Sequence, residues 1–359
     1  MKRIAVLGAG GFVGTRLVEF AALTGAAEVI PVIRSLKSAA SLSRFGRNWV
    51  LANANSPGEL GSAIANCDAV VNCTVGELNR LAATTTGIWE SCAAMNVPRL
   101  VHISSAEVFG RAEEPDMHDD SPPVARHWMQ YARAKAAAEQ ALRPRLGDKR
   151  LCCIVLRPGL VWGPRSPWVE KPASQLLAST AFLLGGGRGI CNLLYVDNLI
   201  FSILGVVESR EAPSGFYNVA DDELIRWCDY YAALARELKV DFSEIHQLPA
   251  GPFKQTLSSR LEALKDTTVL NRLKLRLGKP TKERLKKVLS LLKTPVPDSG
   301  PVPPPRPIVT RSDWHLQNTL NKLPTSKFTR AFGRLNRLSF EEAMSLTGEW
   351  LRFAGFARS

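Results

Sequence analysis

The sequence predicts an α/β fold in which a doubly wound parallel sheet is followed by a smaller C-terminal lobe. In the first half of the chain, short apolar segments typical of buried strands alternate with helical segments, which indicates a parallel sheet with helices on both faces. The 359 residues exceed the usual size of one domain, and 45% of them are hydrophobic, which is ample for a buried core. We therefore expect one domain over residues 1–165 and a mixed lobe over 166–359 that returns to the core near 190–220.

The first predicted strand, residues 2–7, leads directly into a glycine-rich turn and a helix over 15–22. Gly8, Gly11 and Gly14 follow the spacing Gly-x-x-Gly-x-x-Gly. Glycines at such a turn let the backbone approach a pyrophosphate closely, and the helix N-terminus favours its negative charge. The turn predicts a Rossmann-like NAD(P)-binding domain. Its expected contacts to the dinucleotide are Gly8, Gly10, Gly11, Phe12, Val13 and Gly14.

Arg34 directly follows the second predicted strand, residues 28–33. An NAD-specific protein has an acidic residue near this position, which accepts a hydrogen bond from the ribose 2′-hydroxyl. A guanidinium cannot accept that bond, but it can pair with a 2′-phosphate. NADP(H) is therefore the favoured cofactor. If Arg34 is instead a solvated loop charge, NAD(H) is the alternative.

Residues able to move a proton follow further along the chain. More strands are predicted over 49–52, 69–73 and 99–104. The last of them ends beside Ser104 and Ser105, at the carboxyl end of a strand, where open α/β sheets place their chemistry. Tyr131 and Lys135 are four positions apart, so they share one face of a helix, and the lysine charge can lower the pKa of the phenol. A tyrosine tuned in this way can act as a general acid or base.

These motifs together resemble the extended short-chain dehydrogenase/reductases, and among them the NAD(P)-dependent epimerase/dehydratase family, whose members mostly act on nucleotide sugars. The similarity is carried by the glycine turn, by Tyr131 with Lys135, and by segments at 68–72, 102–110, 156–164, 195–198, 215–219 and 339–350. The family places its active Ser or Thr three residues before a Val-Tyr-Gly, here Val-Phe-Gly at 108–110, which selects Ser105 over Ser104. The resemblance thus implies Ser105, Tyr131 and Lys135 as catalytic residues.

The resemblance also implies further contacts to the cofactor. They are Asn53, Cys73, Thr74 and Pro158, together with Tyr131 and Lys135 themselves. Asn53 stands where the family usually has an aspartate against the adenine, and an amide offers both a donor and an acceptor there.

The neighbours of Ser105 narrow the reaction that the resemblance implies. Where 4,6-dehydratases of the family have Asp-Glu, this chain has Ala106 and Glu107, so dehydration is disfavoured and Glu107 is a candidate substrate contact. Arg165 and Arg188 are candidates to clamp a substrate diphosphate, and the alternative is that both are surface charges. No metal site is predicted, because the acidic residues at 113–120 share no helix or strand register.

The resemblance implies an NAD(P)-dependent epimerase or ketoreductase that acts on a nucleotide-activated sugar by hydride transfer, with Tyr131 as the general acid/base. One alternative is a hydroxysteroid-type or other lipophilic-alcohol dehydrogenase, in which the apolar run at 176–184 would line the pocket. An alternative of another class is a non-catalytic NAD(P)-sensing binding protein, which would have no need of all three catalytic residues. By analogy with the family we expect a homodimer.

Cysteine usage and hydropathy predict a cytoplasmic protein. The seven cysteines are odd in number and form no Cys-x-x-Cys pattern or Cys/His cluster, so neither a disulfide framework nor a zinc site is indicated. The chain opens on its first predicted strand without a leader segment, and no segment is long and apolar enough to cross a bilayer.

Residues 254–293 form an unusual basic segment. They contain twelve Lys or Arg against three acidic residues, a net of +9 in a chain whose total is +13. Leucines recur there at helical spacing, which predicts an amphipathic helical insertion. A solvated basic face is the default interpretation, and peripheral contact with an anionic membrane is the second. Nucleic acid is not expected as a partner, because the segment has no binding motif. A Pro-rich connector at 294–307 follows.

Overall fold

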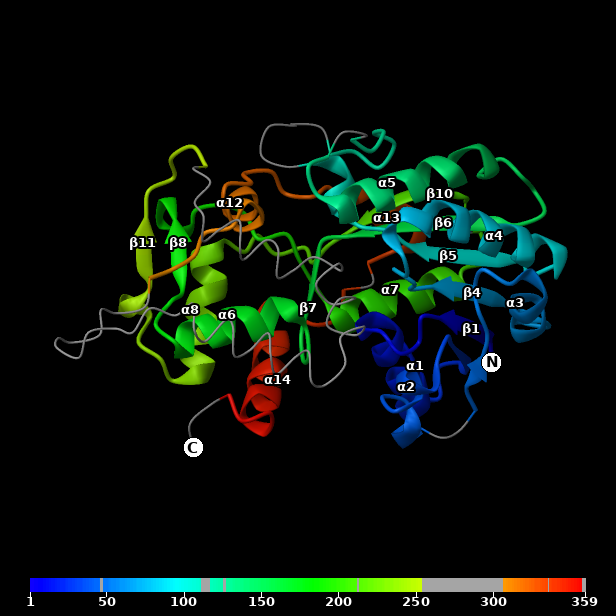
Figure 1. Cartoon of the computed structure of the whole chain (residues 1–359), viewed down its shortest axis with the longest axis horizontal. Coiled ribbons are helices and arrows are strands. Elements are labelled where there is room, and N and C mark those ends of the chain that lie inside the picture. Colours follow the sequence, from blue (N-terminus) through cyan, green and yellow to red (C-terminus); the bar gives the residue numbers. More distant parts are fainter. Residues whose placement is uncertain are drawn as a thin grey trace, which may run out of the picture.

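The computed structural model describes residues 1–45, 48–110, 117–124, 127–211, 213–253, 306–334 and 336–356. The predicted basic insertion, most of the predicted connector and the acidic residues at 113–116 lie outside the described residues. Figure 1 shows a large part built around a sheet beside a smaller, mainly helical part.

A seven-stranded parallel sheet forms the centre of the large part, with strand order β10-β6-β5-β4-β1-β2-β3. Its strands are β1 (Arg3–Leu7), β2 (Glu28–Ile33), β3 (Val50–Leu51), β4 (Ala69–Asn72), β5 (Arg99–Ile103), β6 (Cys152–Pro158) and β10 (Gly215–Val219). Strand order reverses between β1 and β4, and open α/β sheets bind ligands at such a switch point. The predicted Rossmann-like, doubly wound class is confirmed.

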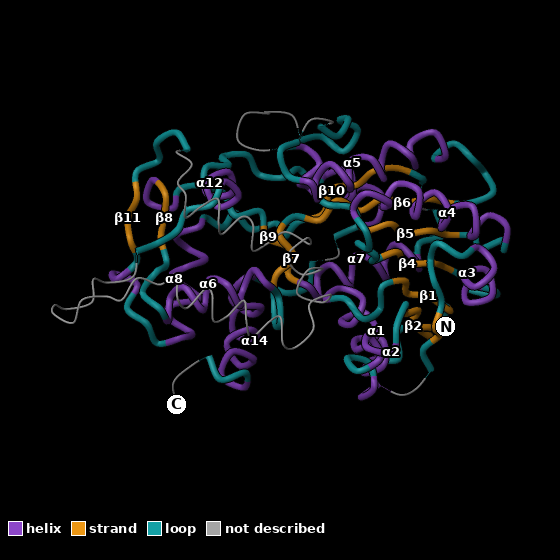
Figure 2. Tube along the Cα trace, viewed as in Figure 1, coloured by secondary structure: helices purple, strands orange, loops and turns teal. Residues whose placement is uncertain are grey.

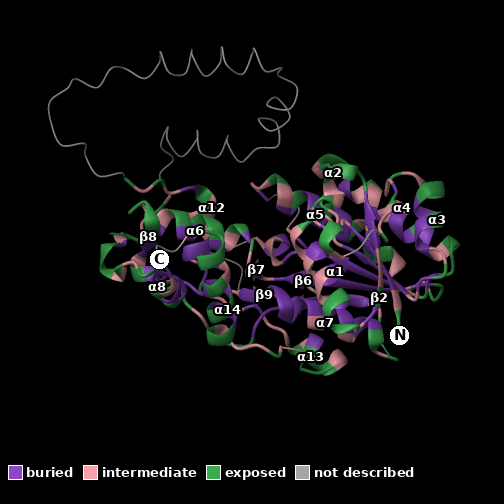
Figure 3. Cartoon of the chain, turned by 90° about the horizontal axis from the view of Figure 1, so that it is seen from below, coloured by how far each residue is buried: buried purple, intermediate pink, exposed green. Residues whose placement is uncertain are grey.

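Helices cover both faces of the sheet because its strands are apolar on both sides. Ile4 and Val6 of β1 belong to one buried cluster, whereas Ala5 and Leu7 belong to another, as expected when successive side chains point to opposite faces. The first cluster includes residues of α1 (Phe12–Thr24) and α7 (Val196–Glu208). The second includes residues of α3 (Pro57–Ile64), α4 (Leu81–Ala94) and α5 (Gln130–Leu142). Figure 3 shows this buried interior. The short α2 (Leu36–Ala39) follows β2.

The smaller part has its own buried cluster. Its helices are α6 (Pro167–Leu177), α8 (Trp227–Leu238), α12 (Arg311–Gln317) and α14 (Phe340–Phe353). Two short parallel pairs accompany them: β7 (Leu160–Trp162) with β9 (Leu193–Tyr195), and β8 (Phe182–Leu184) with β11 (His246–Leu248). Trp162 is fully buried at the centre of the cluster, against the rings of Tyr195 and Tyr230. The β7 and β9 pair lies between the two parts of the molecule (Figure 2).

The chain crosses between the two parts more than once. After β9 it forms α7 and β10 of the large sheet before it enters α8 of the smaller part. α13 (Ser326–Phe332) packs against β10, and α14 then completes the smaller part. Among the described residues, no helix combines the length and hydropathy needed to cross a membrane.

Candidate active site

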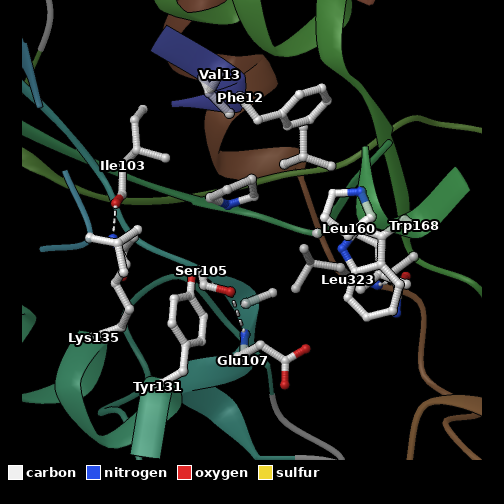
Figure 4. A pocket seen from close by; sticks show the side chains of 18 of the residues that line it. Phe12, Val13, Ile103, Ser105, Glu107, Tyr131, Lys135, Leu160, Trp168 and Leu323 are labelled. Carbon is white, nitrogen blue, oxygen red and sulfur yellow. Dashed lines mark hydrogen bonds between the residues drawn. The ribbon is translucent and has the colours of Figure 1, made fainter. Parts of the chain in front are cut away.

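The structure brings Ser105, Tyr131 and Lys135 together where β5 ends against the start of α5 (Figure 4). Ser105 directly precedes a short 3-10 turn, and its Oγ accepts a hydrogen bond of 3.2 Å from the N–H of Glu107. The side chain of Tyr131 lies beside that of Ser105 and borders the same cavity. Lys135 lies one turn after Tyr131, and its Nζ is 6.0 Å from the centre of the phenol ring.

Burial controls the protonation of this site. It lowers the pKa of Lys135 to about 8, and Nζ donates a hydrogen bond of 2.7 Å to the carbonyl of Ile103. Burial raises the pKa of Tyr131, and the neighbouring hydroxyl of Ser105 only partly opposes that shift. In the protein without a dinucleotide, the prediction that Lys135 lowers the pKa of Tyr131 is therefore wrong. The ammonium is directed to a backbone carbonyl, and the cost of burying a phenolate dominates.

The glycine turn between β1 and α1 leaves room for a ligand against the backbone. Gly8 has φ +76°, a conformation that favours glycine. A Cβ on Gly14 would lie 2.5 Å from the carbonyl oxygen of Gly8, so the helix can approach the turn closely only with glycine there. Gly11 is the N-cap of α1, and no side chain caps the helix. These free N-terminal amides fit the pyrophosphate of a dinucleotide.

A cavity of about 500 Å³ lies between the glycine turn, the predicted catalytic residues and the smaller part. Predicted residues that line it are Gly11, Phe12, Val13, Gly14, Cys73, Ser105, Glu107, Tyr131, Lys135 and Pro158. Among the described lining residues, Lys135 and Glu107 are the charged ones.

The other predicted cofactor residues lie at the same sheet edge but do not line the cavity. Arg34 is exposed directly after β2. The backbone N–H of Asn53 donates to Glu59 at 3.0 Å. Thr74 Oγ1 donates to the side chain of Asn72 at 2.6 Å. Gly8 and Gly10 belong to the glycine turn itself.

Neither predicted diphosphate clamp lines the main cavity. Arg165 lines a neighbouring cavity of about 340 Å³, on which Gly10 and Gly11 also border. Arg188 is exposed, and its carbonyl accepts a hydrogen bond of 2.6 Å from Arg226.

The apolar wall of the cavity was not predicted from the sequence. It consists of Val75, Met117, Leu160, Val161, Pro167, Trp168, Ile190, Leu316 and Leu323. The prediction that the run at 176–184 lines a lipophilic pocket is wrong. Leu176, Leu183 and their neighbours pack in the core of the smaller part instead. Leu316 and Leu323 follow the Pro-rich connector, where no local motif indicates a role in the site.

The doubly wound sheet, the glycine turn and the Ser-Tyr-Lys site define an extended short-chain dehydrogenase/reductase. The chain belongs to the NAD dependent epimerase/dehydratase family, whose model matches residues 4–220. It is therefore an NAD(P)-dependent enzyme of the oxidoreductase and epimerase class.

Individual relatives are distant. A sterol-4-alpha-carboxylate 3-dehydrogenase, decarboxylating, from Dictyostelium discoideum is 24% identical over 273 residues, which span 72% of this chain and 83% of that protein. A dTDP-6-deoxy-L-talose 4-dehydrogenase (NAD(P)(+)) from Kitasatospora kifunensis is 32% identical over 197 residues, 52% of this chain and 59% of that protein. The structure of a dTDP-glucose 4,6-dehydratase from Streptomyces venezuelae, with NAD and TYD bound, matches with a TM-score of 0.67 at 17% identity, covering 98% of this chain and 97% of that one. At that identity the structural match shows the fold alone.

Proposed function

We propose that the protein is an NAD(P)-dependent reductase or dehydrogenase that moves a hydride at a carbinol carbon of a substrate whose remaining part is apolar. The make-up of the cavity carries this proposal. In Figure 4, Leu160, Trp168 and Leu323 face Ser105 and Tyr131 across it. Proteins hold a diphosphate with Arg or Lys, and the described lining has no arginine beside Lys135.

Ser105 and Tyr131 have the geometry to handle the proton of this reaction. The Ser105 hydroxyl would bond the substrate oxygen, and Tyr131, which borders the same cavity, would give or take the proton. Because burial raises the pKa of Tyr131, its phenol is protonated near neutral pH, which suits a general acid and hence reduction of a ketone. A bound nicotinamide supplies the hydride. Lys135 would hold the cofactor ribose.

NADPH is the proposed reductant. Arg34 is exposed at the end of β2, where a guanidinium can pair with a 2′-phosphate. Denaturing the purified protein and identifying any released dinucleotide, followed by NADPH and NADH titrations of the free protein, tests this choice. Tighter binding of NADPH is expected. Tightly retained NAD would contradict it and favour an epimerase that recycles its hydride.

A nucleotide-activated sugar is the second candidate substrate, favoured by the 32% identity to the dTDP-6-deoxy-L-talose 4-dehydrogenase. A non-catalytic NAD(P) sensor is disfavoured, because it would not need Ser105, Tyr131 and Lys135 together at one cavity. NADPH oxidation with 3-oxosterols, 2-alkyl-3-oxoalkanoates and dTDP-4-keto sugars separates these cases. Turnover of the dTDP sugars alone would contradict the apolar substrate.

Replacing Tyr131 by Phe tests the proposed acid. Tyr131→Phe removes one hydroxyl from a buried ring, so we expect the fold and NADPH affinity to persist. Turnover of the best substrate of the panel should fall at least about a hundredfold, the usual contribution of a general acid. Steady-state NADPH oxidation and fluorescence titration measure the two effects.

Tyr217→Phe is the matched control. Tyr217 Oη donates to the carbonyl of Pro213 at 2.8 Å, on β10 and outside the cavity lining. Its loss should leave turnover close to that of the wild type. Full activity in Tyr131→Phe would rule out the proposed role of the phenol.

A further inference from the structure

A buried ion pair that the proposed reaction does not use lies behind the catalytic residues. Glu139 on α5 and Arg157 on β6 both have side chains that are 0% exposed. Arg157 donates to the Glu139 carboxylate through Nε at 3.0 Å and Nη2 at 2.6 Å. Apolar residues of similar volume often stabilise a protein core as well as a buried ion pair does. A contribution to stability is therefore a poor explanation for the pair of Glu139 and Arg157.

Further contacts hold Arg157 in one place. Its Nη1 donates to the carbonyl of Asp119 at 2.8 Å, and its Nη2 donates to the carbonyl of Ser121 at 3.3 Å. The guanidinium carbon lies 4.6 Å from the ring centre of Phe109 and 4.7 Å from that of Phe216. The charge opposite Glu139 is therefore fixed in position.

Glu139 is also one of two helix residues that bond the end of β5. Ile103 is bonded to Lys135 at 2.7 Å and Ser104 to Glu139 at 2.5 Å, and the next residue, Ser105, borders the same cavity as Tyr131. Because Tyr131, Lys135 and Glu139 are spaced by four, they share one face of α5. The bond between Ser104 and Glu139 therefore lies directly beside Ser105 and beside the bond that holds Lys135.

Among the described groups that face Lys135, Glu139 is the one fixed negative charge. These are Cys73 after β4, His102 on β5, and Tyr131 and Glu139 on α5. Burial raises the pKa of the Cys73 thiol to about 12, lowers that of His102 well below its usual value and raises that of Tyr131, so all three are neutral near pH 7. Burial lowers the pKa of Lys135 to about 8, and the charge of Glu139 opposes that shift.

We propose that Glu139, held by Arg157, is a positioning residue of the hydride-transfer site, an inference that rests on the proposed function. Its carboxylate fixes Ser104, and with it the position of Ser105 and of the Ile103 carbonyl that Lys135 bonds. The same carboxylate keeps Lys135 charged, as a residue that holds the cofactor ribose must be. Ser104 thereby has a role distinct from that of Ser105.

Titration of Lys135 in the protein without added dinucleotide tests whether the Glu139 carboxylate keeps Lys135 charged. NMR of lysines labelled at Cε follows the ammonium, and its signal is assigned by its loss in Lys135→Met. Glu139→Gln leaves the charge of Arg157 unbalanced, so the pKa of Lys135 should fall by about one unit. The double variant Glu139→Gln/Arg157→Gln removes both charges and should return the titration toward that of the wild type. A purely structural role would not produce this reversal.

Glu90→Gln is the matched control, because Glu90 is an exposed carboxylate on α4 that pairs with Arg145 at 3.3 Å. It should leave the Lys135 titration unchanged. An unchanged titration in Glu139→Gln would overturn the proposal. If that variant is not recovered folded, Ser104→Ala removes the same tether, and hydrogen exchange of the amides at 103–109 should accelerate about tenfold. Unchanged exchange there would equally overturn it.

NADPH affinity separates failure of this inference from failure of the proposed function. Affinity measured from about pH 6.5 to about 9 should begin to weaken at lower pH in Glu139→Gln than in the wild type, since Lys135 loses its proton earlier. A shifted Lys135 titration in a chain that binds neither NADPH nor NADH would support control of Lys135 by Glu139 and contradict the proposed function.

Discussion

Gly14 has the least space of the residues in the glycine turn. A Cβ at this position would lie 2.5 Å from the carbonyl oxygen of Gly8 and 2.8 Å from Cα of Ala9, and both are backbone atoms that cannot rotate away. Gly14→Ala should therefore push α1 away from the turn and misplace the amides that face the pyrophosphate. We expect NADPH affinity to fall at least about tenfold, because a small misplacement of binding groups has large effects. Fluorescence titration measures the loss.

Gly87→Ala is the matched control for this change. Gly87 lies within α4, and an added Cβ would meet nothing within 4 Å. Alanine in the middle of a helix should stabilise the protein by about 0.5–1 kcal/mol and leave NADPH affinity unchanged. Equal affinity in both variants would show that the turn tolerates a side chain.

At the residue scale, a property of a residue can be predicted from the sequence when positions close to it in the chain decide that property. Gly14, Tyr131 and Lys135 stand in motifs with fixed spacing, so their neighbourhood could be predicted from the chain. The protonation of Tyr131 could not, because it depends on burial by residues distant in sequence. The same holds for Leu323, which reaches the cavity only through tertiary packing.

At the element scale, α14 begins with a capping box. Ser339 accepts a hydrogen bond of 3.3 Å from the N–H of Glu342, whose carboxylate accepts one of 2.8 Å from the N–H of Ser339. Ser339→Ala should lower the free energy of unfolding by about 1 kcal/mol. Urea unfolding followed by circular dichroism measures this. Ser345→Ala, at an exposed position within the same helix, should have little effect, and equal losses in both would exclude a capping role.

Strand boundaries were predicted better for β2, which has a neighbour on each side, than for the edge strand β3. The second strand was expected over 28–33 and is observed there, where it pairs with a neighbour on each side. The third was expected over 49–52, but only Val50 and Leu51 pair. An edge strand has one partner, so pairing can end before the apolar segment does.

At the scale of the whole molecule, the segment after the connector is held against the cavity by close backbone contacts. A Cβ on Gly189 would lie 2.0 Å from the carbonyl oxygen of Gln317, and Ile190 donates its N–H to Thr319 at 2.6 Å. Gly189→Ala should force the two backbones apart. We expect a loss of about 2 kcal/mol in the free energy of unfolding and faster proteolysis between 306 and 325.

Gly58→Ala is the control for that prediction, since an added Cβ there meets nothing within 4 Å. Its unfolding curve and proteolysis pattern should match those of the wild type. Comparable instability in both variants would mean that the contact between Gly189 and Gln317 does not hold the segment in place.

The position of β10 at the edge of the sheet has a consequence for synthesis. β10 is the neighbour of β6, yet it is translated only after α6, β8, β9 and α7. While the ribosome makes these residues, the nascent sheet has β6 as an open edge, and unpaired edges recruit other chains. Premature termination before residue 215 would leave that edge permanently uncovered. Such fragments should aggregate rather than persist as small dinucleotide-binding proteins.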